Sequence, residues 1–325
     1  MDIAKNFLQV ENLRTYFFTR WGTVKAVEGV SFSIKKGDTF GLVGESGCGK
    51  SVTCLSILRL VPEPAGRIVG GQILLEGEDL LKKSKKEMRK IRGGRISMIL
   101  QDPMTSLNPV FTVGNQLTEA IKLHKRLRGR DLWDAAKEML RRVCIPSPEA
   151  RLRNYPYELS GGMKQRVVGA IALSCEPHLL IADEPTTSLD VTIQSQYLRL
   201  LKELQGEAGL TLIFVTHDLG IVARICEWVA VMYAGRIVEM AKVREIFNHP
   251  AHPYTVALLK AVPKVEERVK RLASIEGHPP SLHHLPPGCT FTPRCPVKSD
   301  KCNSQEFPFS MEVAPEHWTK CWLYA

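Results

Sequence analysis

The chain has 325 residues, of which 44% are hydrophobic and 24% are charged, enough for about two domains with buried cores. Its 24 glycines and 20 prolines form no simple repeat, which excludes a collagen-like, mucin-like or wholly disordered protein. A formal net charge of +10 first suggests nucleic acid or an anionic membrane face as a partner. Nine cysteines, in a chain too long to need disulfides, suggest a reducing compartment in which some thiols bind metal.

The sequence has no targeting or membrane-spanning signal. Residues 1–10 lack the charged start and long apolar stretch of a signal peptide. No window approaches the roughly 20 apolar residues that cross a bilayer. We therefore expect a cytosolic protein that reaches a membrane only through a partner or a surface.

Short apolar runs alternate with amphipathic segments up to about residue 245. Helical spacing puts the apolar side chains of Gln194–Leu204 on one stripe. Five apolar runs are predicted to be buried strands: Thr39–Val43, Ile96–Leu100, Leu179–Ala182, Thr211–Val215 and Trp228–Tyr233. Buried strands that alternate with helices predict an α/β fold with a mainly parallel sheet, and Val30–Ile34 and Gln72–Leu75 indicate an antiparallel flank.

Two later regions break this alternation. Strand signals vanish between Pro103 and about Leu159, where Asp131–Val143 has the pattern of an amphipathic helix, so we predict a helical subdomain over about residues 103–160. After about Glu245, repeated prolines interrupt every period, which indicates a separate, loop-rich unit. The predicted domains are residues 1–245 and 246–325.

A phosphate-binding motif lies between a predicted strand and a predicted helix. It reads GxxxxGKS and consists of Gly44, Glu45, Ser46, Gly47, Cys48, Gly49, Lys50 and Ser51, followed by the helical Val52–Leu60. The glycines let successive N–H groups turn toward a β-phosphate, and the helix adds its N-terminal dipole. Lys50 would bridge the β- and γ-phosphates, and the Ser51 hydroxyl would hold Mg²⁺. A Gly-rich turn with a solvated lysine is the alternative, and it leaves the strand-and-helix context unexplained.

Two adjacent carboxylates end the predicted strand Leu179–Ala182. Asp183 suits the Mg²⁺ shell, and Glu184 suits polarising an attacking water. General-base assistance of this kind contributes about 10²–10⁴-fold in rate. A strand that ends in two carboxylates is common, but behind a phosphate-binding loop it is a strong signal.

The motifs together resemble the ATP-binding cassette of ABC transporters, over roughly residues 7–245. The segment Leu159-Ser160-Gly161-Gly162-Met163 precedes the helical Lys164–Leu173, and the expected order also contains Gln101, Ser188-Leu189-Asp190 and His217-Asp218. The resemblance implies that two cassettes pack head to tail, with each ATP between one phosphate loop and the other subunit's LSGG segment. A helix N-terminus that begins with Gly-Gly is well suited to grip a γ-phosphate.

The resemblance also implies a role for individual residues. Gln101 would touch Mg²⁺ and the attacking water, and His217 would contact the γ-phosphate. The in-trans contacts to ATP would come from Ser160, Gly161, Gly162 and Asp190, and the cis contacts from residues 44–52, including Val52. Phe17 is the first choice for stacking on adenine, and Trp21 is its competitor. Because Glu184 and His217 are both present, we expect the site to hydrolyse ATP.

Further motifs resemble one subunit of oligopeptide/dipeptide-type importers. LSGGM, together with segments 183–187 and 190–194, is typical of the D-type ATPase there, and His252-Pro253-Tyr254-Thr255 before a Pro-rich tail is a second mark. This favours a heterodimer with an F-type ATPase over a homodimer. It also implies two transmembrane permeases, an extracytoplasmic solute-binding protein and a location at the cytoplasmic face of the membrane. The expected cargo is a peptide, with oligosaccharides and metal chelates left open.

Other classes of cassette fit the sequence less well. DNA-maintenance cassettes carry a long insertion before LSGG, whereas here Lys50 and Ser160 lie only 110 positions apart. A non-hydrolysing cassette would lack Glu184 or His217. The basic runs at Lys82–Arg95 and Lys122–Arg130 contain no interleaved aromatic residues, so no nucleic-acid partner is expected.

Four cysteines gather in the last 37 residues: Cys289, Cys295, Cys302 and Cys321. Four thiolates in a short, poorly cored unit predict a metal site, although the spacing matches neither a zinc ribbon nor a ferredoxin. The residues alone leave zinc, iron–sulfur and free thiols open, and the expected cytosolic location disfavours disulfides. The resemblance to peptide-importer ATPases implies a structural [4Fe-4S] cluster, with Zn²⁺ as the alternative. The other cysteines are expected to be ordinary: Cys48 in the phosphate loop, and Cys54, Cys144, Cys175 and Cys226 as small core residues.

Overall fold

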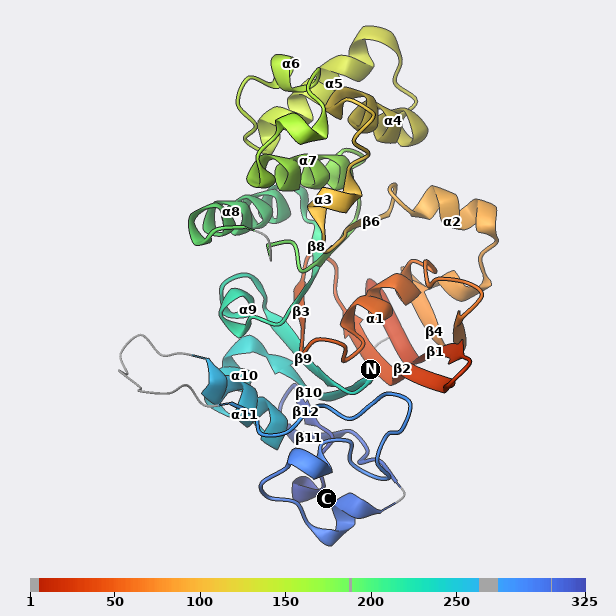
Figure 1. Ribbon diagram of the computed structural model, residues 1–325, viewed down its shortest axis with the longest axis vertical. Helices are drawn as coiled ribbons and strands as arrows, with labels where there is room; N and C mark the ends of the chain where they lie inside the picture. Colours follow the sequence, from red (N-terminus) through yellow and green to blue (C-terminus); the bar gives the residue numbers. More distant parts are fainter. Residues whose placement is uncertain (1–5, 187–188, 263–273, 305) are drawn as a thin grey trace. The chain divides into compact units, whose positions relative to one another are not determined.

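A computed structural model describes residues 6–186, 189–262, 274–304 and 306–325 (Figure 1). The chain forms two compact units, one from residues 1–81 and 215–325 and the other from residues 82–214. Thr187 and Ser188, which belong to the motifs predicted at 183–187 and 188–190, lie outside the described residues, as do residues 263–273 and 305. The domain boundary near residue 245 stays a prediction.

An antiparallel sheet forms one part of the first unit. Its strand order is β2-β1-β4-β5, with bounds Leu8–Thr19 (β1), Gly22–Ile34 (β2), Gly66–Leu75 (β4) and Glu78–Asp79 (β5). Leu8 at the start of β1 lies opposite Ile34 of β2 on one side and Leu75 of β4 on the other, and all three are buried. The expected antiparallel flank is therefore confirmed, with longer strands than the sequence indicated.

The first unit also contains a mixed set of strands in the order β11-β12-β10-β9-β3. The bounds are Thr39–Val43 (β3), Trp228–Tyr233 (β9), Arg236–Lys242 (β10), Met311–Ala314 (β11) and His317–Thr319 (β12). β3 and β9 run parallel, and the other neighbouring pairs are antiparallel. Every residue of β3 is buried, which explains why its sequence has no polar alternation.

The helices of this unit follow the strands. They are α1 (Lys50–Ile57), α9 (Leu219–Ile225), α10 (Val243–Asn248) and α11 (Pro253–Ala261), with short 3₁₀ turns at Thr292–Arg294, Asp300–Asn303 and Trp322–Tyr324. The C-terminal tail is joined more closely to the sheet than its composition indicated, because β12 pairs antiparallel with β10. Trp318 of β12 stacks on Trp228 of β9, with ring centroids 6.3 Å apart.

The second unit contains β6 (Ile96–Ile99), β7 (Leu179–Asp183) and the first four residues of β8 (Thr211–Thr216), in the order β8-β7-β6. β6 and β7 are parallel, as predicted. The helices are α2 (Lys85–Ile91), α3 (Pro103–Ser106), α4 (Val113–Lys125), α5 (Gly129–Arg142), α6 (Pro148–Arg151), α7 (Gly161–Leu173) and α8 (Val191–Ala208). Between β6 and β7 the described residues contain helices and no strand, which agrees with the expected helical segment.

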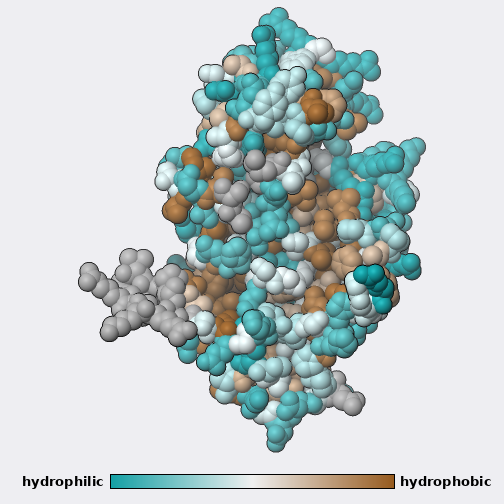
Figure 2. Space-filling model, viewed as in Figure 1, coloured by the Kyte–Doolittle hydropathy of each residue, from teal (hydrophilic) through white to brown (hydrophobic). Residues whose placement is uncertain are grey.

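The face of the molecule drawn in Figure 2 is largely polar. Figure 2 shows hydrophilic residues over most of the face in view, with hydrophobic residues in separate groups among them. Of the helices that the structure describes, none is both long and apolar enough to cross a membrane.

The basic run at residues 82–95 contains the helix α2. Ser84 and Glu87 form a capping box at the start of this helix.

Candidate functional site

The phosphate-binding loop has the backbone that its glycines allow. Gly44 has a φ of 154° and Gly49 a φ of 106°. A Cβ on either residue would lie 2.2 Å from a carbonyl oxygen, that of Met232 for Gly44 and that of Ala26 for Gly49. Any larger side chain at these positions would push the loop off the strands beneath it.

Lys50 is the first residue of α1 and is 5% exposed. Its Nζ donates hydrogen bonds to the carbonyl oxygens of Gly44 at 2.8 Å and Glu45 at 3.1 Å. Ser51 and Val52 follow in the first helical turn, where backbone N–H groups have no partner within the helix. Ser46 and Gly47 are exposed at the tip of the loop, and Cys48 is buried, which raises the pKa of its thiol. The loop thus combines a buried cation with a helix N-terminus.

The C-terminal tail holds the phosphate-binding loop directly. Arg294 is 4% exposed at its side chain and donates to both carboxylate oxygens of Glu45, at 2.7 and 3.1 Å. The backbone N–H of Glu45 donates to the hydroxyl of Tyr254 at 3.0 Å. Burial lowers the pKa of Arg294, but the hydrogen bonds to Glu45 and Tyr233 outweigh burial and raise it. Sequence reasoning missed this contact, and its only signal was an arginine inside the Cys289–Cys295 segment.

In the second unit, the parallel pairing of β6 and β7 brings two predicted residues together. Ile99 lies opposite Ala182, so Gln101 and Glu184 both follow the same edge of the sheet. The Nε2 of Gln101 donates to a carboxylate oxygen of Glu184 at 3.0 Å. Asp183 is 3% exposed and Glu184 8%. Glu184 has a φ of 45°, in the left-handed region that a non-glycine residue occupies at a cost and that is often found at functional sites.

The predicted in-trans residues also meet in the second unit. Ser160 caps α7 by accepting a hydrogen bond from the N–H of Met163 at 3.3 Å, and Asp190 caps α8 through the N–H groups of Thr192 and Ile193. Both residues, together with Gly161 and Gly162, line a cavity of about 520 Å³. Two segments that lie 30 positions apart in sequence therefore border one cavity at two helix N-termini.

The remaining predicted residues lie in the first unit. His217 is exposed directly after β8, and Asp218 caps α9. Phe17 on β1 is half-buried beside Gly66, whereas Trp21 is 71% exposed. Which aromatic residue stacks on adenine stays a prediction.

The four tail cysteines are close enough for their charges to influence one another. Cys289, Cys302 and Cys321 are buried and Cys295 is half-buried. Burial, together with the charges of the other three thiols, raises the pKa of Cys321 to about 11. Among the residues that the structure describes, no group of three or more His, Cys, Asp or Glu side chains is placed to hold a metal ion. The predicted four-cysteine site is therefore not supported by this arrangement, in which the Sγ of Cys302 accepts a hydrogen bond from the backbone N–H of Ser299 at 3.5 Å.

Comparison with known proteins agrees with this geometry. Residues 27–187 match the family described as ABC transporter, and residues 238–302 match the oligopeptide/dipeptide transporter C-terminal region. The dipeptide transport ATP-binding protein DppD of Bacillus subtilis (strain 168) is 50% identical over 316 residues, which cover 97% of this chain and 94% of DppD. The chain belongs to the ABC transporter ATP-binding proteins.

Two further relatives support this assignment. The oligopeptide transport ATP-binding protein AppD of Bacillus subtilis (strain 168) is 47% identical over 317 residues, covering 98% of this ABC ATPase and 96% of AppD. The ATP-binding cassette MJ0796, solved as a dimer bound to ADP and Pi, is 26% identical with a TM-score of 0.66, and the match covers 73% of this chain and 99% of that one. The ABC ATPase therefore binds and hydrolyses ATP, as the motifs predicted.

Proposed function

We propose that this ABC ATPase powers the uptake of peptides by an importer. The main support is that the oligopeptide/dipeptide C-terminal region contacts the phosphate-binding loop through its own side chains. Tyr254 and Arg294 lie within that region, and both contact Glu45. The similarity to DppD and AppD extends over nearly the whole chain, including this tail.

In this proposal, the site residues have the roles that the motifs predicted. Lys50 leaves the carbonyl oxygens of Gly44 and Glu45 and binds the β- and γ-phosphates. Ser51, Asp183 and Gln101 would hold Mg²⁺, which when bound neutralises phosphate charge. The donor set of one hydroxyl, one carboxylate and one amide fits a hard cation.

Glu184 positions the attacking water in line with the γ-phosphate, and the Gln101 amide orients the Glu184 carboxylate through their 3.0 Å hydrogen bond. His217 contacts the γ-phosphate. A second cassette supplies the equivalents of Ser160, Gly161, Gly162 and Asp190. These residues lie at the N-termini of two helices, which stabilise negative charge. In this chain the same residues border the cavity of about 520 Å³, where the γ-phosphate of ATP bound to the second cassette would lie.

The assembly that we propose contains a second, F-type ATPase, two transmembrane permeases and an extracytoplasmic solute-binding protein, with this chain at the cytoplasmic face. Closure of the two cassettes on ATP and their opening after hydrolysis would move the permeases.

Cargo and partners are tested together in vesicles. The chain is reconstituted with the proposed permeases and the proposed companion ATPase, and ATP hydrolysis is measured with the solute-binding protein loaded in turn with peptides, oligosaccharides or metal chelates. We expect stimulation by the peptide-loaded protein. Stimulation only by an oligosaccharide or a chelate would reassign the cargo, and full activity without the companion ATPase would contradict the heterodimer.

We also propose that the tail cysteines hold a [4Fe-4S] cluster, with Zn²⁺ as the alternative. Four thiols, three of them buried, have donor chemistry that fits either group, and their mutual charge repulsion would be relieved by a cation. The thiols would have to move from their present hydrogen bonds to reach it.

Anaerobic purification with iron, sulfide and zinc analysis tests this proposal. We expect iron in the natural chain and its loss in Cys302→Ser, while the control Cys175→Ser, in the other unit, keeps it. Stoichiometric zinc would favour the alternative, and the absence of both metals would contradict the site.

A further inference from the structure

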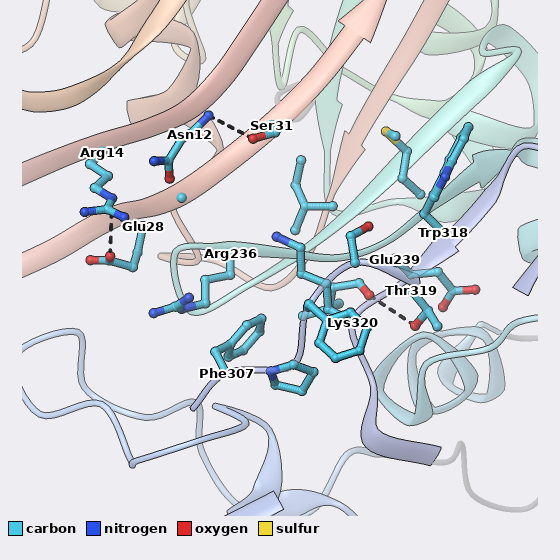
Figure 3. Close-up of a pocket in the computed structure, with 17 residues that line it drawn as sticks. Asn12, Arg14, Glu28, Ser31, Arg236, Glu239, Phe307, Trp318, Thr319 and Lys320 are labelled. Carbon is cyan, nitrogen blue, oxygen red and sulfur yellow. Dashed lines mark hydrogen bonds and ion pairs between the residues drawn. The ribbon is translucent and has the colours of Figure 1, made fainter. Parts of the chain in front are cut away.

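A second cavity lies in the first unit, away from the phosphate-binding loop. It has a volume of about 390 Å³ and is bordered by β1, β2, β10 and the tail segment Phe307–Lys320 (Figure 3). Three basic side chains line it, those of Arg14, Arg236 and Lys320. Aromatic residues of the tail, Phe307, Phe309 and Trp318, form its apolar part.

Both carboxylates that line the cavity already have partners. Glu28 accepts a hydrogen bond from the hydroxyl of Tyr16 at 2.6 Å and pairs with Arg14 at 3.8 Å. Glu239 is 1% exposed, and its oxygens lie 2.7–2.8 Å from three nitrogens, the backbone N of Ala251, the backbone N of His252 and Nε2 of His317. Neither carboxylate accepts a hydrogen bond from Arg236 or Lys320, although the charge of Glu28 acts on Arg236.

Within the part of the chain that the structure describes, the side chains of Arg236 and Lys320 have no hydrogen-bond acceptor, although the negative charge of Glu28 acts on Arg236. The guanidinium of Arg236 lies over the ring of Phe307 at 4.3 Å from its centroid, and its buried Nε has no hydrogen-bond partner. Within the described residues, the amine of Lys320 has neither a hydrogen-bond nor an ion-pair partner. Burial and, to a smaller extent, the positive charge of Arg236 lower the pKa of Lys320 to about 8. Two partly buried cations that repel each other and have no acceptor are costly for a folded protein.

We propose that this cavity binds a small organic anion, with its carboxylate or phosphate group between Arg236 and Lys320 and its apolar part against Phe307 and Phe309. The anion would supply the acceptors that the two cations lack, and charge-assisted hydrogen bonds of this kind are among the strongest in proteins. An aromatic wall beside a pair of cations favours a ligand that carries an apolar group over a bare inorganic ion.

This site is independent of the proposed transport function. A bound anion would join the tail to strands β1 and β10, so it would stabilise the folded tail by mass action. Its effect would be measurable on the isolated chain without any importer component.

Calorimetric titration with benzoate and with phenyl phosphate tests the proposal, and neutral benzyl alcohol serves as the apolar control. Titrations are run with saturating MgADP so that the phosphate-binding loop is occupied. We expect at least one anion to bind and benzyl alcohol not to bind. Binding of benzoate alone identifies a carboxylate ligand, and binding of phenyl phosphate alone identifies a phosphorylated one.

Variants locate the site. Lys320→Met and Arg236→Met should each weaken anion binding by about ten-fold or more, whereas Lys320→Arg should retain it. The matched control Lys298→Met, at an exposed tail lysine outside the cavity, should leave it unchanged. Circular dichroism checks that each variant is folded. No binding of either anion, equal binding of benzyl alcohol, or unchanged binding in folded Lys320→Met would overturn the proposal.

Discussion

Two lysines of the first unit have opposite surroundings. Lys50 in the phosphate-binding loop donates to the carbonyl oxygens of Gly44 and Glu45, so its charge has partners before any ligand binds. Lys320 lies in the cavity beside the tail, where burial and the positive charge of Arg236 both disfavour the charged form of its amine. The difference indicates that the loop exchanges existing acceptors for phosphate oxygens, whereas the cavity is incomplete without an added anion.

The two regions also differ in how they are built. The phosphate-binding loop is made by eight consecutive residues and is then held in place by the tail through Arg294 and Tyr254. The cavity has no local motif, because its cations come from β1, β10 and the residue after β12. Changes at the two regions should therefore have separable effects.

The largest effect is expected at Glu184, the carboxylate that we propose to be catalytic. Glu184→Gln should keep ATP binding and lower hydrolysis by about 10²–10⁴-fold, because the amide cannot accept a proton from water. Nucleotide titration and steady-state phosphate release measure the two effects. Glu119→Gln, at an exposed position on α4, is the control. Undiminished turnover would remove Glu184 from its role, and a loss of benzoate binding would break the separation of the two regions.

The contact between Arg294 and Glu45 should produce the next largest effect. Arg294→Met leaves the Glu45 carboxylate without its partner, and loss of a hydrogen bond to a charged group costs about 1.5–3 kcal/mol. We expect the KM for ATP to rise by roughly ten-fold or more, with a smaller change in kcat, because the loop that grips the phosphates is loosened. Arg294→Lys should restore part of the affinity. A fall in kcat alone, at constant KM, would contradict a positioning role for Arg294.

Removal of the unpartnered lysine should stabilise the protein. Lys320→Met replaces a partly buried cation by an apolar side chain of similar length, so at pH 7 we expect the free energy of unfolding to rise by about 1–2 kcal/mol. Urea unfolding at equilibrium measures this change. Destabilisation of similar size would mean that the lysine has a partner in the folded chain.

The smallest effect is the pH dependence of that gain. The pKa of Lys320 is about 8 in the folded chain and 10.5 ordinarily, so between these values the unfolded chain binds more protons. The stability of the natural chain therefore rises with pH in this window, and the advantage of Lys320→Met should shrink from pH 8 to 10.5. The charged groups that border the same cavity, Arg14, Glu28, Arg236 and Glu239, are present in both proteins, so the difference between the two unfolding curves isolates Lys320. A constant difference across this range would contradict the lowered pKa.

Much of the fold followed from local patterns. β3 and β9 have the predicted bounds, and β6, β7 and β8 differ from their predictions by one residue, because uninterrupted apolar runs leave buried strands as the favoured outcome. The hydrogen bond between Gln101 and Glu184 was not predictable from either residue alone. It requires the parallel register of β6 and β7, which places the ends of these strands side by side. Gln101 and Glu184 meet there although they lie 83 positions apart in the sequence.

The tail was the least predictable region. Four cysteines within the last 37 residues indicated a metal site. In the described part of the chain, however, no three of them are placed to hold a metal ion. The distribution of positive charge along the sequence also did not indicate where the unusual cation lies. The basic run at residues 82–95 drew attention as the richest, whereas the cation with the most unusual surroundings is the isolated Lys320.

The sequence by itself determined the phosphate-binding loop, the order of its partner motifs and the family, because these depend on residues that are consecutive or that end a recognisable strand. Only the tertiary structure decided that Arg294 holds Glu45 across 249 positions and that Arg236 and Lys320 share a cavity in which neither has a hydrogen-bond acceptor among the described residues. The reason is physical: hydrogen bonding and desolvation act on whichever groups the fold brings together, and chain spacing carries no record of such distant neighbours.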